Sequence, residues 1–88
     1  MDFGSSLAHL RAKTGKSKYR LSQLSGLDQA FIGRLEKGAK NPSRNTVILL
    51  GLALVHNCSA IDCDEIDDLL LAAGFAPLKD MRPRVSLR

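Results

Sequence analysis

The chain has 88 residues, 44% of them hydrophobic and 25% charged, which is the size and composition of one small globular domain. Its aromatic residues are one tyrosine and three phenylalanines, without tryptophan, which argues against a stacking surface for single-stranded nucleic acid. No apolar run reaches the roughly 18 residues that a membrane helix needs, and the first residues lack the basic start of a signal peptide. We therefore expect a cytoplasmic protein that contacts no membrane.

The net charge of +4 is unevenly distributed along the chain. Residues 1–46 carry nine Lys and Arg against three acids, whereas residues 47–88 carry four Lys and Arg against six acids. A basic half next to an acidic half indicates a surface for a polyanion on the first half. The charge alone equally fits a basic face that only water contacts.

The residue types that carry most enzyme chemistry are scarce. His56, Cys58 and Cys63 follow no known zinc-ligand spacing, and a structural site needs four ligands, so we expect no metal and no cofactor. The sequence offers no nucleophile–histidine set, no glycine loop for phosphate and no carboxylate pair in a cleft. We expect a protein that is not an enzyme and that has no small-molecule ligand.

Three short helices are predicted in the first half of the chain. Phe3, Leu7 and Leu10 have helical spacing and predict the first helix, which ends before Gly15. The N-cap residue types and the glycines that follow predict two more helices. Ser17 caps the second, which runs to about residue 25, and Asp28 caps the third over residues 29–37.

Two further helices are predicted in the second half. Residues 47–55 are apolar apart from Gly51 and fit a buried strand or a buried helix, and Ser43 as a cap favours a fully buried helix. Asp62 and Glu65 have the spacing of a capping box, and a helical apolar face follows them up to Gly74. We expect an all-α domain of five helices over residues 1–77 and an irregular C-terminal tail over residues 78–88.

The predicted second and third helices, within residues 18–37, are joined by a tight turn. Gly26 provides the positive φ that such a turn requires. Apolar side chains that lock the two helices together are expected to face inward, namely Leu21, Leu27, Ile32 and Leu35. This arrangement is a helix-turn-helix, in which the second helix can enter the major groove of DNA. Gln29 and Arg34 remain as exposed polar side chains on that helix.

The segment LSQLSGLDQAFIGRLEKG over residues 21–38, followed by Asn-Pro-Ser over 41–43, resembles the Cro/repressor-like (XRE) helix-turn-helix family. The resemblance covers about residues 5–75, and IGRLEKG over 32–38 is its most specific part. It implies a five-helix, lambda-repressor-like DNA-binding domain. The chain departs from the family pattern at three positions, where Ser22 replaces a small alanine, Ser25 an apolar residue and Gly33 a frequent serine.

The resemblance implies base contacts for three residues of the third helix. Gln29 matches the first base-reading position, where a glutamine can bond adenine through N6 and N7. Ala30 matches the next position and offers a methyl group to thymine. Arg34 matches the position one turn later, where arginine favours guanine O6 and N7.

Further roles carried by the resemblance concern phosphate contacts and stability. Phosphate contacts set affinity and register rather than sequence preference, and the matching residues are Ser17, Lys18, Lys37, Lys40, Arg44 and Asn45. Arg11 and Glu36 match a partly buried salt bridge between the first and third helices. Two residues have open roles: Phe31 faces DNA or covers the helix surface, and Tyr19 packs or donates its hydroxyl to a phosphate.

The expected function is sequence-specific binding of double-stranded DNA by a small transcriptional regulator, most simply a repressor. One domain contacts few base pairs, so we expect a homodimer on a palindromic operator. Its interface is expected in the C-terminal half, with the candidates Leu69, Leu71, Phe75, Leu78 and Val85. The alternative is an antitoxin-like interaction module whose main partner is another protein.

Overall fold

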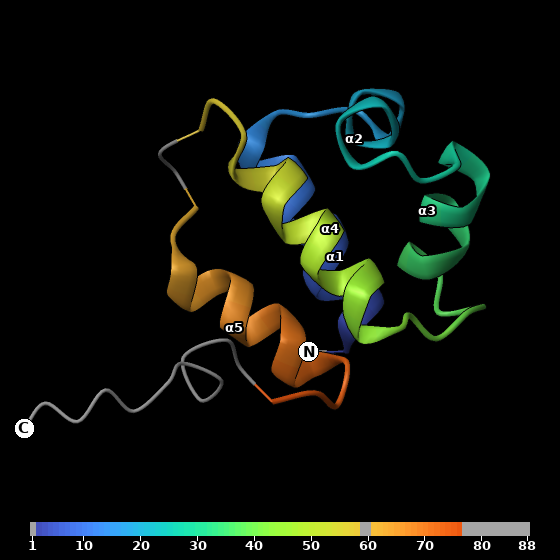
Figure 1. Cartoon of the computed structure of the whole chain (residues 1–88). Coiled ribbons are helices and arrows are strands. Elements are labelled where there is room, and N and C mark those ends of the chain that lie inside the picture. Colours follow the sequence, from blue (N-terminus) through green and yellow to red (C-terminus); the bar gives the residue numbers. More distant parts are fainter. Residues whose placement is uncertain (1, 59–60, 77–88) are drawn as a thin grey trace, which may run out of the picture.

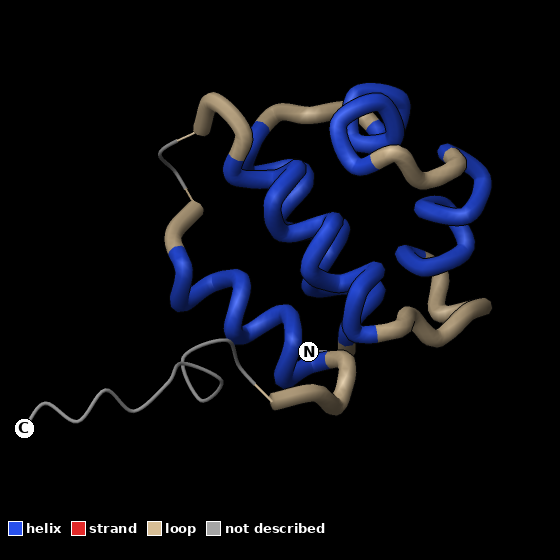
Figure 2. The backbone as a smooth tube through the Cα atoms, in the orientation of Figure 1, coloured by secondary structure: helices blue, strands red, loops and turns tan. Residues whose placement is uncertain are grey.

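A computed structural model describes residues 2–58 and 61–76. These residues form five α-helices and no strand, joined by short loops (Figure 1 and Figure 2). The helices are α1 (Phe3–Thr14), α2 (Lys18–Ser25), α3 (Gln29–Glu36), α4 (Arg44–Val55) and α5 (Cys63–Ala72). The expected all-α, five-helix fold is confirmed, whereas the predicted tail over residues 78–88 lies outside the described residues.

Polar side chains start the helices largely as the sequence predicted. Ser17, Ser43 and Asp62 each accept a hydrogen bond from the backbone N–H three residues later. Glu65 completes the capping box at α5 by accepting from the backbone N–H of Asp62. The cap predicted at Asp28 is wrong in one respect, because this residue precedes α3 in an extended conformation but its side chain makes no capping hydrogen bond.

The α3 helix also ends one residue earlier than predicted. Lys37 is its C-cap, and Gly38 follows with a φ of 79°. Glycine adopts this left-handed conformation without the steric penalty that a Cβ brings. The chain therefore turns away from α3 directly after Lys37 and leaves that side chain exposed at the helix end.

The α1 and α4 helices pack against each other at the centre of the domain, with α2 and α3 on one side and α5 on the other (Figure 1). The core combines side chains from all five helices and from Ile61, and its fully buried members include Leu7, Leu21, Ile32, Leu35, Val47, Leu50, Leu54, Leu69 and Leu70. The apolar segment 47–55, for which a buried strand was the alternative, lies within α4 and is a helix.

The α4 helix is not fully buried, and that part of the prediction is wrong. Leu49 is 42% exposed and Leu52 is 59% exposed. Other helices cover α4 where it contacts α1, α2 and α5, and its remaining side faces solvent because no further element lies over it among the described residues. None of the helices in residues 2–58 and 61–76 is long and apolar enough to cross a membrane.

A salt bridge joins α1 to the end of α3. Arg11 Nε lies 2.6 Å from Glu36 Oε2, and Arg11 Nη2 lies 3.2 Å from Glu36 Oε1, so the contact is bidentate. The side chains of Arg11 and Glu36 are 21% and 8% exposed. The hydrogen bond to Glu36 raises the pKa of Arg11 above its ordinary value. The pair that the family resemblance implied is thus present and partly buried.

Two lysines fasten α1 and the turn after it to the second half of the chain. Lys16 Nζ donates to the backbone oxygen of Leu54 at 3.1 Å, near the end of α4. Lys13 Nζ lies 2.7 Å from Glu65 Oε2 on α5. The Lys16 contact satisfies one of the carbonyls that a helix leaves unpaired at its C-terminus.

The packing of α1 on α3 requires a glycine at position 4. A Cβ placed on Gly4 would lie 2.6 Å from the backbone oxygen of Glu36 and 2.7 Å from that of Leu35. These atoms belong to the backbone and cannot move aside as a side chain would. The absence of a side chain at Gly4 therefore brings α1 close to the C-terminal turn of α3.

Removal of one partner of the salt bridge should destabilise the fold. In Glu36→Ala the guanidinium of Arg11 stays partly buried without its carboxylate. We expect a loss of about 1–3 kcal/mol of unfolding free energy, between the values for exposed and buried pairs. Lys37→Ala is the matched control, since Lys37 is the next residue and is exposed. Equal melting temperatures for the two variants in thermal unfolding would contradict this role of the pair.

The two helical glycines at positions 4 and 33 should respond oppositely to alanine. A Cβ on Gly33 would meet no atom within 4 Å, and alanine is a better helix former than glycine by about 0.5–1 kcal/mol. We expect Gly33→Ala to raise the unfolding free energy by that amount and Gly4→Ala to lower it. Denaturant titration measures both, and a stabilising Gly4→Ala would show that the α1–α3 contact is looser than described.

Candidate nucleic-acid interface

Three residues close the turn between α2 and α3. Gly26 has a φ of 77° and ends α2. Ser22 Oγ donates to the backbone oxygen of Leu27 at 2.6 Å, and Ser25 Oγ accepts from the backbone N–H of Leu27 at 3.1 Å. The serines that depart from the family pattern thus hold both polar groups of Leu27. Their hydroxyls give the turn a fixed geometry by hydrogen bonding.

The buried side chains of α2 and α3 determine which residues of these helices face outward. Leu21, Ile32 and Leu35 are fully buried, and Leu27 packs against the core from the turn. These are the four residues that the sequence predicted to lock the two helices together. Because their side chains define which side of each helix is buried, Gln23, Gln29 and Arg34 face solvent.

The outward residues of α3 line a shallow hollow together with the start of α2. Its lining consists of Lys18, Gln29, Ala30, Gly33, Arg34 and Lys37. All three residues predicted to read bases are in this set, and so are two of the residues predicted to bind phosphate. The structure therefore brings a glutamine and three cations to one surface.

The polar side chains of this hollow are free to bind a ligand. Gln29, Arg34 and Lys37 are exposed and Lys18 is half-buried. Among the described residues no hydrogen bond or ion pair engages their side-chain polar atoms. Glu36, the one acidic residue of α3, is not available to these cations because it pairs with Arg11 of α1. The cations of the hollow are thus not neutralised within the described part of the chain.

Gly33 belongs to the hollow, a place that its departure from the family pattern did not predict. It is four residues after Gln29 and four before Lys37, which places all three on one helix face. This spacing could have revealed its position. It adds no side chain to the hollow, although a Cβ at this position would meet no atom of another part of the domain within 4 Å.

The other predicted phosphate contacts do not line the hollow. Ser17 is exposed, and its hydroxyl caps α2. Lys40 is exposed in the loop after α3, while Arg44 and Asn45 are the first two residues of α4, half-buried and exposed respectively. Phe31 is half-buried and packs against the core, so the structure favours its role in covering the helix surface.

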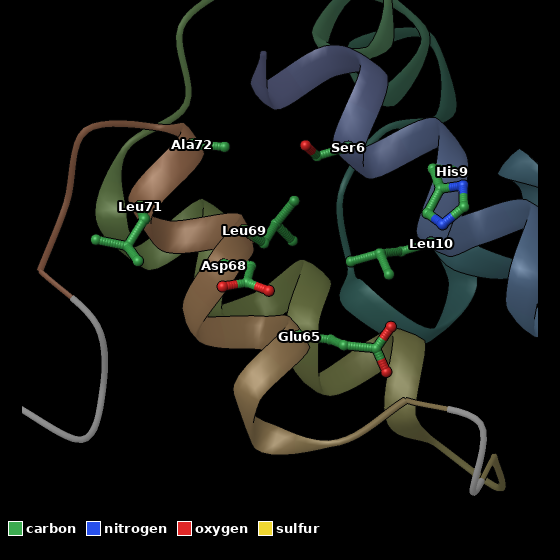
Figure 3. A pocket seen from close by; sticks show the side chains of 8 residues that line it. All are labelled: Ser6, His9, Leu10, Glu65, Asp68, Leu69, Leu71 and Ala72. Carbon is green, nitrogen blue, oxygen red and sulfur yellow. The ribbon is translucent and has the colours of Figure 1, made fainter. Parts of the chain in front are cut away.

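A second hollow lies between α1 and α5 (Figure 3). Its apolar lining is Leu10, Leu69, Leu71 and Ala72, and its polar lining is Ser6, His9, Glu65 and Asp68. Leu69 is fully buried, so its proposed place in an exposed dimer interface is wrong: this side chain completes the core.

Two other interface candidates lie within the described residues, and only Leu71 of these lines the second hollow. Leu71 is 55% exposed on α5, and Phe75 is half-buried against the core. The remaining two candidates, Leu78 and Val85, lie outside the described residues.

Within residues 2–58 and 61–76, no three His, Cys, Asp or Glu side chains gather where they could hold a metal ion.

The comparisons with known proteins leave this geometry as the basis for assigning a function. No protein-family model, no curated protein and no solved structure matches the chain. The residues of the α2–α3 surface and their physical chemistry are therefore what indicates a function.

Proposed function

We propose that the protein binds double-stranded DNA sequence-specifically, with α3 in the major groove. The observation that carries this proposal is the hollow lined by Lys18, Gln29, Arg34 and Lys37, whose polar side chains have no partner in the described residues. The turn fixed by Ser22 and Ser25, and the core contacts beneath it, hold α3 at a set angle to α2. Recognition by a preorganised helix loses little conformational entropy on binding.

Each polar residue of the hollow has a chemical role in this proposal. Gln29, at the first turn of α3, presents a donor and an acceptor that match N7 and N6 of adenine. Arg34, more than one turn later, presents the bidentate donor pair that matches guanine O6 and N7. Lys18 and Lys37 flank them on α2 and at the end of α3, where they bind phosphate groups and release counterions.

We propose further that the working form is a homodimer acting as a transcriptional repressor. Three base-contacting side chains discriminate weakly against the competing sites of a genome. Two copies related by a two-fold axis place two reading helices about 34 Å apart on a palindrome. Exposed Leu71 on α5 supports an interface there, since α5 packs on the opposite side of the central helices from α2 and α3 (Figure 1). A dimer bound over a promoter occludes it from transcription.

A second candidate function, a module whose main partner is another protein, is favoured by a different observation. Leu49 and Leu52 are exposed three residues apart on α4 and thus share a face. An apolar helix face of this kind suits a protein partner. Salt separates the two functions, because DNA affinity falls steeply with salt through counterion release, whereas apolar contacts respond little.

Selection of bound sequences from random duplex DNA tests the proposed function directly. We expect enrichment of one short motif and an affinity for it that decreases as the salt concentration rises. Recovery of no motif, together with binding that is weak and independent of sequence, would contradict sequence-specific recognition. Titration of the selected duplex at several salt concentrations then gives the number of phosphate contacts from the slope.

Arg34→Ala and Lys18→Ala should weaken DNA binding in different ways. Loss of a bidentate base contact should cost about 1–3 kcal/mol on the selected duplex and relax the preference at one base pair. Loss of a phosphate contact should weaken all duplexes alike and lower the salt slope by about one. Arg20→Ala is the control, because Arg20 is an exposed cation of α2 that does not line the hollow. An unchanged motif in Arg34→Ala would refute its base contact.

Leu71→Asp should weaken self-association without unfolding the protein. Leu71 is 55% exposed, so its replacement removes little core packing, whereas a charge placed in an apolar interface is unfavourable. Sedimentation at micromolar concentration, with and without a palindromic duplex, measures the association. Leu52→Asp is the matched control, since Leu52 is exposed to a similar extent on α4. A wild-type chain that stays monomeric and binds the duplex one-to-one would refute the dimer.

A further inference from the structure

Tyr19 is an exposed aromatic residue next to the proposed DNA surface. Its side chain is 59% exposed, as much as any large apolar side chain in the described residues. Packing against the core does not explain it, because the residues of α2 that are buried are Leu21 and Ser25. Two roles were open for Tyr19, packing and donation of its hydroxyl to a phosphate, and its exposure favours donation.

A neighbouring side chain fixes the position of the Tyr19 hydroxyl. Gln23, one turn later on α2, donates from Nε2 to the phenol oxygen at 2.9 Å. A phenol has one O–H donor in addition to its acceptor capacity. Because Gln23 uses the oxygen as an acceptor, the O–H remains available to donate, and no acceptor for it lies among the described residues. Tyr19 and Gln23 together form an oriented, uncharged donor.

The position of this donor follows from the geometry of α2. Lys18 precedes Tyr19 and lines the hollow. With about 100° between successive residues of an α-helix, Tyr19 is turned about 100° and Gln23 about 140° from Lys18 around α2, and both are on the side turned away from buried Leu21. The phenol is therefore exposed outside the hollow and adjacent to Lys18 in sequence, so that a duplex bound in the hollow would meet it where its sugar–phosphate backbone passes α2.

We infer that Tyr19 donates its O–H to a phosphate oxygen of the bound duplex and that Gln23 is the residue that positions it. The inference rests on the proposed function. A phosphate oxygen is an acceptor with no donor of its own, and Tyr is among the uncharged side chains that contact DNA phosphates. A neutral hydroxyl adds affinity and register through a directed hydrogen bond, whereas a lysine adds them through charge and counterion release.

Tyr19→Phe tests the inference on the full chain with the duplex recovered by selection. The variant keeps the ring and removes only the hydroxyl, so we expect an unchanged melting temperature and an affinity lower by about fivefold to thirtyfold. The salt slope should stay at the wild-type value, because no charge is removed, whereas Lys18→Ala lowers it by about one. Wild-type affinity in Tyr19→Phe, or a loss accompanied by a lower slope, would overturn the inference.

A double-mutant cycle tests the role of Gln23. We expect Gln23→Ala to weaken binding less than Tyr19→Phe does, and the double variant to bind no more weakly than Tyr19→Phe alone. Losses that add would show that Gln23 contacts the duplex independently and would overturn its positioning role. The two hypotheses fail differently. If the wild-type protein enriches no duplex in the selection, the proposed function is refuted. If the wild-type protein and Tyr19→Phe bind the selected duplex equally tightly, only this inference is refuted.

Discussion

The salt bridge between Arg11 and Glu36 is the interaction on which the position of the proposed binding surface depends. It is bidentate, it lies between α1 and the last turn of α3, and the same guanidinium donates to the backbone oxygen of Lys16 at 3.1 Å, in the turn before α2. One side chain thus connects three parts of the domain. Gly4 supplements it, because α1 can approach the end of α3 only where no Cβ intervenes. In a domain of this size, with a modest core, a partly buried ion pair has a large share in orienting one short helix.

Stability and recognition place different demands on α3. The helix has eight residues, and helices of this length are marginal in isolation, so tertiary contacts must hold it. Ile32 and Leu35 provide those contacts on one face. On the other face Gly33 lowers helix propensity although nothing in the fold needs a glycine there. The compensation comes from neighbours, namely the Glu36 salt bridge and the two serine hydroxyls that fix Leu27 in the turn.

The molecule presents chemically different surfaces on different sides. Cations and amides gather where α2 meets α3, and the side chains there have no partner in the described residues. Apolar Leu49, Leu52 and Leu71 are exposed on α4 and α5. The charge asymmetry of the sequence follows the same division, since the acids of the second half are concentrated at the start of α5, where Asp64 and Glu65 suit the positive end of the helix dipole. This division fits the proposed binding of a polyanion on one side and of another protein surface elsewhere.

The sequence by itself determined the elements of this fold and much of the candidate site. Helical spacing, caps and glycines are local signals, so they predicted five helices, the turn at Gly26 and the outward polar residues Gln29 and Arg34, whereas Ala30 was added only by the family resemblance. The tertiary structure decided what depends on contacts between distant residues: that Leu69 is buried, that Leu49 and Leu52 are not, and that Phe31 packs against the core. It also decided that Gly33 lies in the hollow and that Tyr19 stands exposed beside Gln23. Periodicity shows that a helix has an apolar face, but how much of that face is covered depends on which helices pack against it, and no local pattern specifies this.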